Sequence, residues 1–140
     1  MLHLMKLAVG VRDLAHLRSL QAARLRTDPP LRHRTRSFPR RAPELLAGGS
    51  IYWVIGGAMI VRQRLTAIAP AEAPDGSKAA ALVFDPTLVP IEPRFVKPFQ
   101  GWRYLEPTAA PRDLAPRRAG RGEARLPERL RLALAELCLP

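Results

Sequence analysis

The feature that most constrains the fold is a long apolar segment interrupted by two glycines. Residues 51–55 read Ile-Tyr-Trp-Val-Ile, Gly56-Gly57 follow, and residues 58–68 continue with mostly apolar side chains. Two adjacent glycines can adopt positive φ at both central positions of a tight turn, so this segment predicts a β-hairpin. Because both faces of the strands are apolar near the turn, we expect the hairpin to be covered on both sides.

The two-residue loop determines the expected pairing of the two strands. The expected partners are Ile55 with Ala58, Val54 with Met59, Trp53 with Ile60, and Tyr52 with Val61. Successive side chains of a strand point to opposite faces. Arg62 and Arg64 should therefore share one face of the return strand, while Gln63 and Leu65 share the other.

Other segments predict helices and further strands around this hairpin. We expect a strand at residues 2–9, a helix from an Asp13 cap to about Leu25, a helical turn at 42–46, a strand at 79–84, an extended surface segment at 86–98, and a last strand at 99–105 with a bend at Gly101. The core-facing stripe of the helix would be Leu14, Leu17, Leu20 and Leu25. These elements predict one α+β domain over residues 1–106, with a small curved antiparallel sheet and flanking helices.

The rest of the chain has a different composition. Residues 107–125 are rich in Pro, Ala, Arg and Gly, which predicts a flexible linker. Four leucines then recur at helical spacing, and they predict an amphipathic C-terminal helix at residues 126–140: Leu126, Leu130, Leu134 and Leu137.

Composition excludes several classes of protein. The 140 residues include one Cys, which rules out an internal disulfide framework, and no Cys or His has the spacing of a zinc site. No apolar run reaches the roughly 20 residues of a membrane span. The chain carries no phosphate-loop or dinucleotide-binding fingerprint. We therefore expect a cytoplasmic protein with no metal, no cofactor and no membrane contact.

A strong excess of positive charge points to an anionic partner. Lys and Arg total 23 against 12 Asp and Glu, a net charge of +11. Residues 32–41 hold five arginines, one histidine and no acid. Arginine presents a planar set of donors that suits phosphate oxygens, so this segment is a candidate contact for a nucleic-acid backbone. The alternative is a solvated charge run. The candidates from this segment are His33, Arg34, Arg36 and Arg40.

Two further groups of side chains complete the candidate site. Arg62 and Arg64 could hold an anion, or they could pair with an acid such as Asp85, Glu92 or Glu106. Tyr52 and Trp102 could stack on a base, with Arg103 beside the second ring, or they could belong to the core. Trp53, between apolar strand neighbours, is expected to be core.

Several blocks of the sequence resemble a known bacterial family. They are Met5–Gly10, His33–Arg41, Gly48–Ile55, Val61–Arg64 and Phe99–Leu105. Together they resemble domain-of-unknown-function family 1489 over about residues 2–114, and that family implies no activity. The glycine, aromatic strand, short turn and return strand also resemble a hairpin of PUA-like barrels, which include ASCH and EVE domains. That likeness implies a PUA-like barrel and an RNA or modified base held in a basic cleft.

These observations favour binding of RNA or a nucleotide without catalysis. In this hypothesis the arginines contact phosphate, and Trp102 or Tyr52 stacks on a base. A second hypothesis is an enzyme that acts on a nucleotide or modified base, with His33 as its acid or base. A third is an interaction module whose basic face docks an acidic protein partner. Turnover across a nucleotide panel would favour the second, and a specific co-purifying polypeptide would favour the third.

Overall fold

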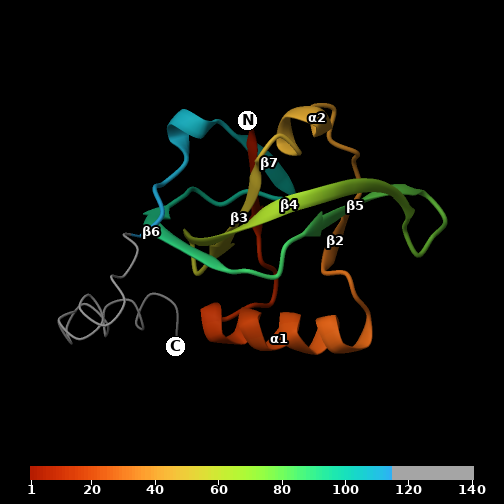
Figure 1. The fold of residues 1–140 in the computed structure, drawn as a ribbon, viewed down its shortest axis with the longest axis horizontal. Coiled ribbons are helices and arrows are strands. Elements are labelled where there is room, and N and C mark those ends of the chain that lie inside the picture. Colours follow the sequence, from red (N-terminus) through yellow and green to blue (C-terminus); the bar gives the residue numbers. More distant parts are fainter. Residues whose placement is uncertain (115–140) are drawn as a thin grey trace.

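The computed structural model of the chain describes residues 1–114, which form one curved sheet and two α-helices (Figure 1). The elements are β1 (His3–Leu7), α1 (Leu14–Thr27), β2 (Arg32–Thr35), α2 (Ala42–Leu45), β3 (Ser50–Ile55), β4 (Ala58–Glu72), β5 (Lys78–Phe84), β6 (Val89–Phe95), β7 (Trp102–Leu105) and a short 3₁₀ turn, η1 (Pro107–Ala109). The expected C-terminal helix at 126–140 lies outside the described residues.

The long strand β4 organises the sheet. The strand order is β2-β5-β4-β3-β1-β7, and β6 also pairs with β4. The first half of β4 pairs with β3 and β6, and its second half pairs with β5. The expected antiparallel sheet is in fact mixed, because β1 and β3 run parallel. A long connection that contains both helices joins these two strands, and such a crossover allows parallel pairing.

The predicted hairpin is present, with a change of register along it. Ile55 pairs with Ala58 and Val54 with Met59, as expected. Beyond them the register shifts by one residue, so Trp53 pairs with Val61 and Tyr52 with Arg62. The expected pairs Trp53–Ile60 and Tyr52–Val61 are therefore wrong. The reason is a β-bulge at Ile60, where one extra residue of β4 enters the ladder.

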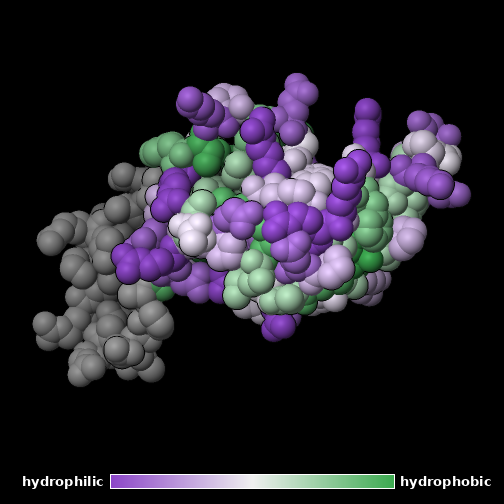
Figure 2. Space-filling model, turned by 90° about the horizontal axis from the view of Figure 1, so that it is seen from above, coloured by the Kyte–Doolittle hydropathy of each residue, from purple (hydrophilic) through white to green (hydrophobic). Residues whose placement is uncertain are grey.

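Two apolar clusters cover the two faces of the hairpin, as its sequence predicts. The larger cluster includes Trp53, Ile55, Leu65 and Leu82, and the smaller one includes Tyr52, Val54, Met59, Ile91 and Leu105. In the view of Figure 1, α1 lies below the sheet and α2 lies above it, and buried residues of both helices belong to the larger cluster: Leu14 and Leu17 of α1 and Leu45 of α2. The surface seen in Figure 2 is mostly hydrophilic, with smaller apolar patches between long polar side chains.

Helix α1 begins as predicted and packs differently near its end. The Asp13 carboxylate accepts a hydrogen bond from the backbone N–H of His16 at 2.7 Å, which caps the helix. Leu14 and Leu17 are buried, but Leu25 is 39% exposed, so its expected core position is wrong. The polar side chain of Gln21 is buried instead.

A buried hydrogen-bond network explains why Gln21 points inward. Its amide exchanges two hydrogen bonds with the amide of Gln63 on β4, at 2.8 and 2.7 Å. Gln63 Oε1 also accepts a hydrogen bond from the indole N–H of Trp53 at 2.8 Å, and Gln63 Nε2 donates to the carbonyl of Asp85 at 3.1 Å. The network therefore ties α1 to β4, to β3 and to the chain that follows β5, and it satisfies polar groups that would be costly to bury alone.

The segment at 86–98, expected to cross the surface in extended form, contains strand β6. Val89–Phe95 pairs with the first half of β4, and Ile91 is buried in the smaller cluster. Its prolines are compatible with a strand at the periphery of a sheet. Residues 107–114, the described part of the expected linker, contact the sheet through an Ile91–Asp113 bridge.

Within residues 1–114, no helix is long and apolar enough to cross a membrane.

Replacing Gln63 with Leu should lower the free energy of unfolding by about 2–4 kcal/mol. The substitution leaves the Trp53 indole N–H and the Gln21 amide buried without their partner. Urea unfolding followed by tryptophan fluorescence measures the change.

Gln100, an exposed residue of the same type, provides the matched control. Gln100→Leu should change the free energy of unfolding by less than about 0.5 kcal/mol. In the Gln21→Leu/Gln63→Leu double variant the free energy of unfolding should fall by less than the sum of the decreases in the two single variants, because the two amides share one network. A Gln63→Leu variant as stable as the parent would contradict this account.

Candidate nucleic-acid interface

A cleft opens where two edge strands of the curved sheet, β2 and β7, face each other. Its volume is about 650 Å³, within the range of small-ligand sites. β1 contributes one lining residue, β2 and the turn after it contribute five, and β7 with its preceding loop contributes three. They are Lys6, His33, Arg34, Thr35, Arg36, Ser37, Gln100, Gly101 and Trp102. None of these residues is acidic, so the cleft favours an anionic ligand.

Lys6 lies at the inner side of the cleft between two tryptophans. In the sheet it is the direct partner of Trp53 on β3 and of Trp102 on β7. The residue is 8% exposed, and its Nζ donates a hydrogen bond to the carbonyl of Leu7 at 3.2 Å. Burial lowers the pKa of Lys6 below its ordinary value. Within residues 1–114, no salt bridge involves Lys6.

The arginines of residues 32–41 divide into two groups. Arg32 at one end pairs with Asp28 at 2.9 Å, and Arg41 at the other end pairs with Glu44 at 2.6 Å. Arg41 also lies over the ring of Tyr104 on β7, which ties this end of the segment to the sheet. The middle cations, Arg34, Arg36 and Arg40, are exposed and make no salt bridge with any described residue.

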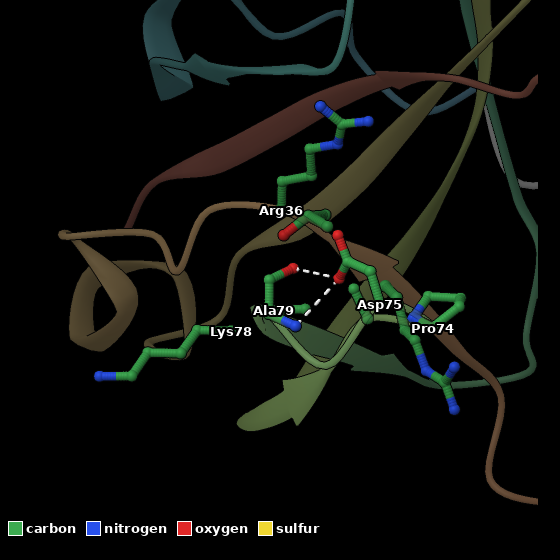
Figure 3. Close-up of a pocket in the computed structure, with 9 residues that line it drawn as sticks. Arg36, Pro74, Asp75, Lys78 and Ala79 are labelled. Atoms are coloured by element: carbon green, nitrogen blue, oxygen red, sulfur yellow. Dashed lines mark hydrogen bonds between the residues drawn. The ribbon is translucent and has the colours of Figure 1, made fainter.

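A second hollow is lined by two of these arginines (Figure 3). Arg34 and Arg36 line it together with the β4–β5 turn, which contributes Asp75, Ser77 and Lys78. Figure 3 shows Asp75 turned toward the turn itself, where its carboxylate accepts hydrogen bonds from the backbone N–H and the hydroxyl of Ser77. Arg36 and Lys78 extend away from it. The one acid of this hollow therefore does not neutralise its arginines.

His33 stands on the inner wall of the cleft. Its ring packs edge-on against Trp53, with 5.9 Å between the ring centroids. Burial, together with the nearby charges of Lys6 and Arg24, lowers the pKa of His33 from 6.5 to about 4. The imidazole is therefore neutral at pH 7, with one nitrogen that donates and one that accepts. A base of such low pKa removes protons weakly at neutral pH, which suits His33 to hydrogen bonding.

Two of the sequence candidates lie on the opposite face of the sheet. Arg62 forms a bidentate salt bridge with Asp113, with N–O distances of 2.7 and 2.8 Å, and it also donates a hydrogen bond to the Ser50 hydroxyl at 2.9 Å. This acid is not among the three expected partners. Tyr52 is 3% exposed and packs in the smaller apolar cluster, next to His3.

The remaining candidates also lie outside the lining of the cleft. Arg103 lies over the ring of Phe99, 5.6 Å from its centroid, on the face of β7 opposite Trp102. Arg64 is exposed on β4, and Arg40 is exposed after β2. Thus the cleft brings together His33, Arg34, Arg36 and Trp102, and it leaves apart Arg40, Tyr52, Arg62, Arg64 and Arg103.

Sequence reasoning missed Lys6 as a cleft residue, whereas Gln100 was expected beside Trp102 as an amide of the same cluster. Lys6 carried a signal, because it interrupts an apolar strand, and a lysine at such a position needs a reason. Gln100 stands next to the predicted stacking residue Trp102, across Gly101, whose φ of 72° turns the chain into β7. Within residues 1–114, no group of three or more His, Cys, Asp or Glu could hold a metal ion.

The pKa of His33 predicts a dependence of stability on pH. Between about pH 6.5 and 4 the unfolded chain binds a proton at His33 that the folded chain does not. The free energy of unfolding should therefore fall as pH decreases through this window. The free energy of unfolding of the His33→Gln variant should fall less steeply with decreasing pH, because glutamine does not titrate. Urea unfolding of both proteins across the window measures the two slopes.

His3, whose pKa is also lowered by burial, contributes in the same direction and remains in both proteins. The difference between the two curves therefore reports His33 alone. Parallel curves would show that the histidine is not held neutral by its surroundings.

Comparison with known proteins places the chain in a family without assigned activity. No curated protein and no solved structure matches the chain. One family model, described as "Protein of unknown function (DUF1489)", matches residues 4–140. The match extends beyond the expected limit near residue 114, so the C-terminal tail is part of the family's sequence pattern. The chain belongs to the DUF1489 family.

Proposed function

We propose that this protein binds single-stranded RNA, or a nucleotide unit of it, in the cleft between β2 and β7 without catalysis. The observation that carries the proposal is the composition of the cleft wall: three cationic side chains, one indole ring and no acid. Phosphate needs cations, and a base needs a flat apolar surface. Both lie within a volume of about 650 Å³.

The arrangement of the cations supports a phosphate ligand. Arg34 projects from β2 and Arg36 from the turn directly after it, and neither makes a salt bridge with a described residue. An exposed guanidinium of this kind can donate to phosphate without first breaking an ion pair. Because both arginines also line the hollow at the β4–β5 turn, a strand of several nucleotides could cross β2 from one hollow to the other.

Trp102 supports the base contact. It is partly exposed on the lining of the cleft, whereas Trp53 is buried. Tyr104 packs edge-on against it, with 5.1 Å between the ring centroids, and so restricts its orientation. A ring held in place loses little side-chain entropy when a base stacks on it.

We also propose that the fold is an α+β fold of the PUA-like barrel type. The strong curvature of the sheet supports it, since edge strands β2 and β7 approach closely enough to line one cleft. The opening between them is then the ligand site itself.

The Arg34→Glu/Arg36→Glu double variant should bind a labelled single-stranded RNA of about ten nucleotides at least about tenfold more weakly. The loss of two phosphate contacts should also reduce the slope of log affinity against log salt by about 0.7 for each contact. Fluorescence anisotropy at several salt concentrations measures both quantities.

Arg12→Glu/Arg18→Glu provides a control with the same change in net charge. Both residues are exposed, and neither lines the cleft. If the control weakened binding as much as the test variant, the effect would come from net charge, and the cleft would not be the site. Absence of RNA and nucleotide binding by the parent at low salt would reject the proposal.

A further inference from the structure

The interior and the rim of the cleft differ in chemistry. Arg34, Arg36 and Gln100 are exposed at the rim, whereas Lys6 and Thr35 are buried and His33 is half-buried. A phosphate carries full negative charge and loses hydration at a high cost, so it should stay at the rim with the guanidinium groups. The interior is then left for the less strongly hydrated part of a nucleotide, its base.

Within this interior, Lys6 has unused hydrogen-bond capacity. A lysine ammonium has three N–H donors and no acceptor. One donor contacts the carbonyl of Leu7, and no other described residue accepts a hydrogen bond from Lys6. A lysine residue that is only 8% exposed and has no carboxylate partner among residues 1–114 is unusual unless a ligand completes its contacts.

The position of Lys6 fits a contact with the edge of a base. Its sheet partners are Trp53 and Trp102, and Trp102 is the ring proposed to stack. A base stacked on Trp102 would therefore have its edge near the strand position of Lys6. Thr35, the other buried polar side chain of the cleft, already donates its hydroxyl hydrogen to the carbonyl of Ser37 at 2.8 Å. Lys6 is thus the buried cationic donor that is available to a ligand, beside the half-buried neutral imidazole of His33.

We propose that Lys6 selects bases that carry a carbonyl oxygen, such as uracil and guanine, over adenine. This inference rests on the proposed function. Uracil and guanine offer carbonyl oxygens as acceptors, whereas adenine presents an amino donor in that place and has only ring nitrogens as acceptors. A buried side chain that can only donate hydrogen bonds is stabilised by a facing carbonyl oxygen, whereas a facing amino group would leave both donors without an acceptor.

Oligo(U) and oligo(A) of equal length, about ten nucleotides, test the inference because they carry the same phosphate charge. The parent protein should bind oligo(U) at least about tenfold more tightly than oligo(A), as measured by fluorescence anisotropy. Lys6→Met, which keeps the length and apolar stem of the side chain, should reduce this ratio to about twofold or less. Arg36→Gln should weaken the binding of both oligomers by the same factor, since Arg36 is proposed to contact phosphate and not the base.

Each outcome separates the inference from the proposed function. If the parent binds neither oligomer, both the proposed function and the inference about Lys6 are rejected. If the parent binds both equally, or if Lys6→Met preserves the preference, Lys6 does not read the base and only the inference fails. Circular dichroism establishes that Lys6→Met folds. Should it not fold, Lys6→Gln takes its place, and the preference of the parent already tests the inference.

Discussion

The buried hydrogen bonds among Gln21, Gln63 and Trp53 hold the parts of this molecule in register. Gln63 lies on the central strand β4, and its amide contacts helix α1, strand β3 and the chain that leads from β5 to β6. A polar network in a low-dielectric interior tolerates few other arrangements, because each broken contact leaves a buried group unpaired. It therefore determines where the Trp53 ring lies, and His33 and Phe84 both pack edge-on against that ring.

The cleft follows from the way this sheet curves. β2 and β7 are edge strands that come close without pairing, so their facing side chains line an open space. The ion pairs of Arg32 and Arg41 hold both ends of the basic segment, and Arg34 and Arg36 between them remain available. The parallel pairing of β1 with β3 sets Lys6 beside Trp53. Ion pairs thus occupy Arg32 and Arg41, whereas Arg34, Arg36 and Lys6 line the cleft.

Features encoded by neighbouring residues could be predicted from the sequence. The Gly56-Gly57 turn, the Asp13 cap and the bend at Gly101 each depend on a few adjacent residues. Features that depend on distant residues could not. Arg62 pairs with Asp113, 51 positions away, and the bulge at Ile60 adjusts β4 to partners on both of its edges. The cleft shows the same limit. Its arginines and Trp102 were candidates from local composition, but Lys6 joins Trp102 through the antiparallel pairing of β1 with β7, strands far apart in the sequence, which no local pattern predicts.

The central claim, that RNA lies between β2 and β7, is tested most directly by ultraviolet crosslinking of a 4-thiouridine-labelled single-stranded RNA, followed by mass spectrometry of the crosslinked peptides. The account predicts crosslinks within residues 33–37 and 100–102, which line the cleft from its two sides. Crosslinks confined to other segments, such as β4 around Arg64 or the chain after residue 114, would contradict it and would move the binding site away from the cleft.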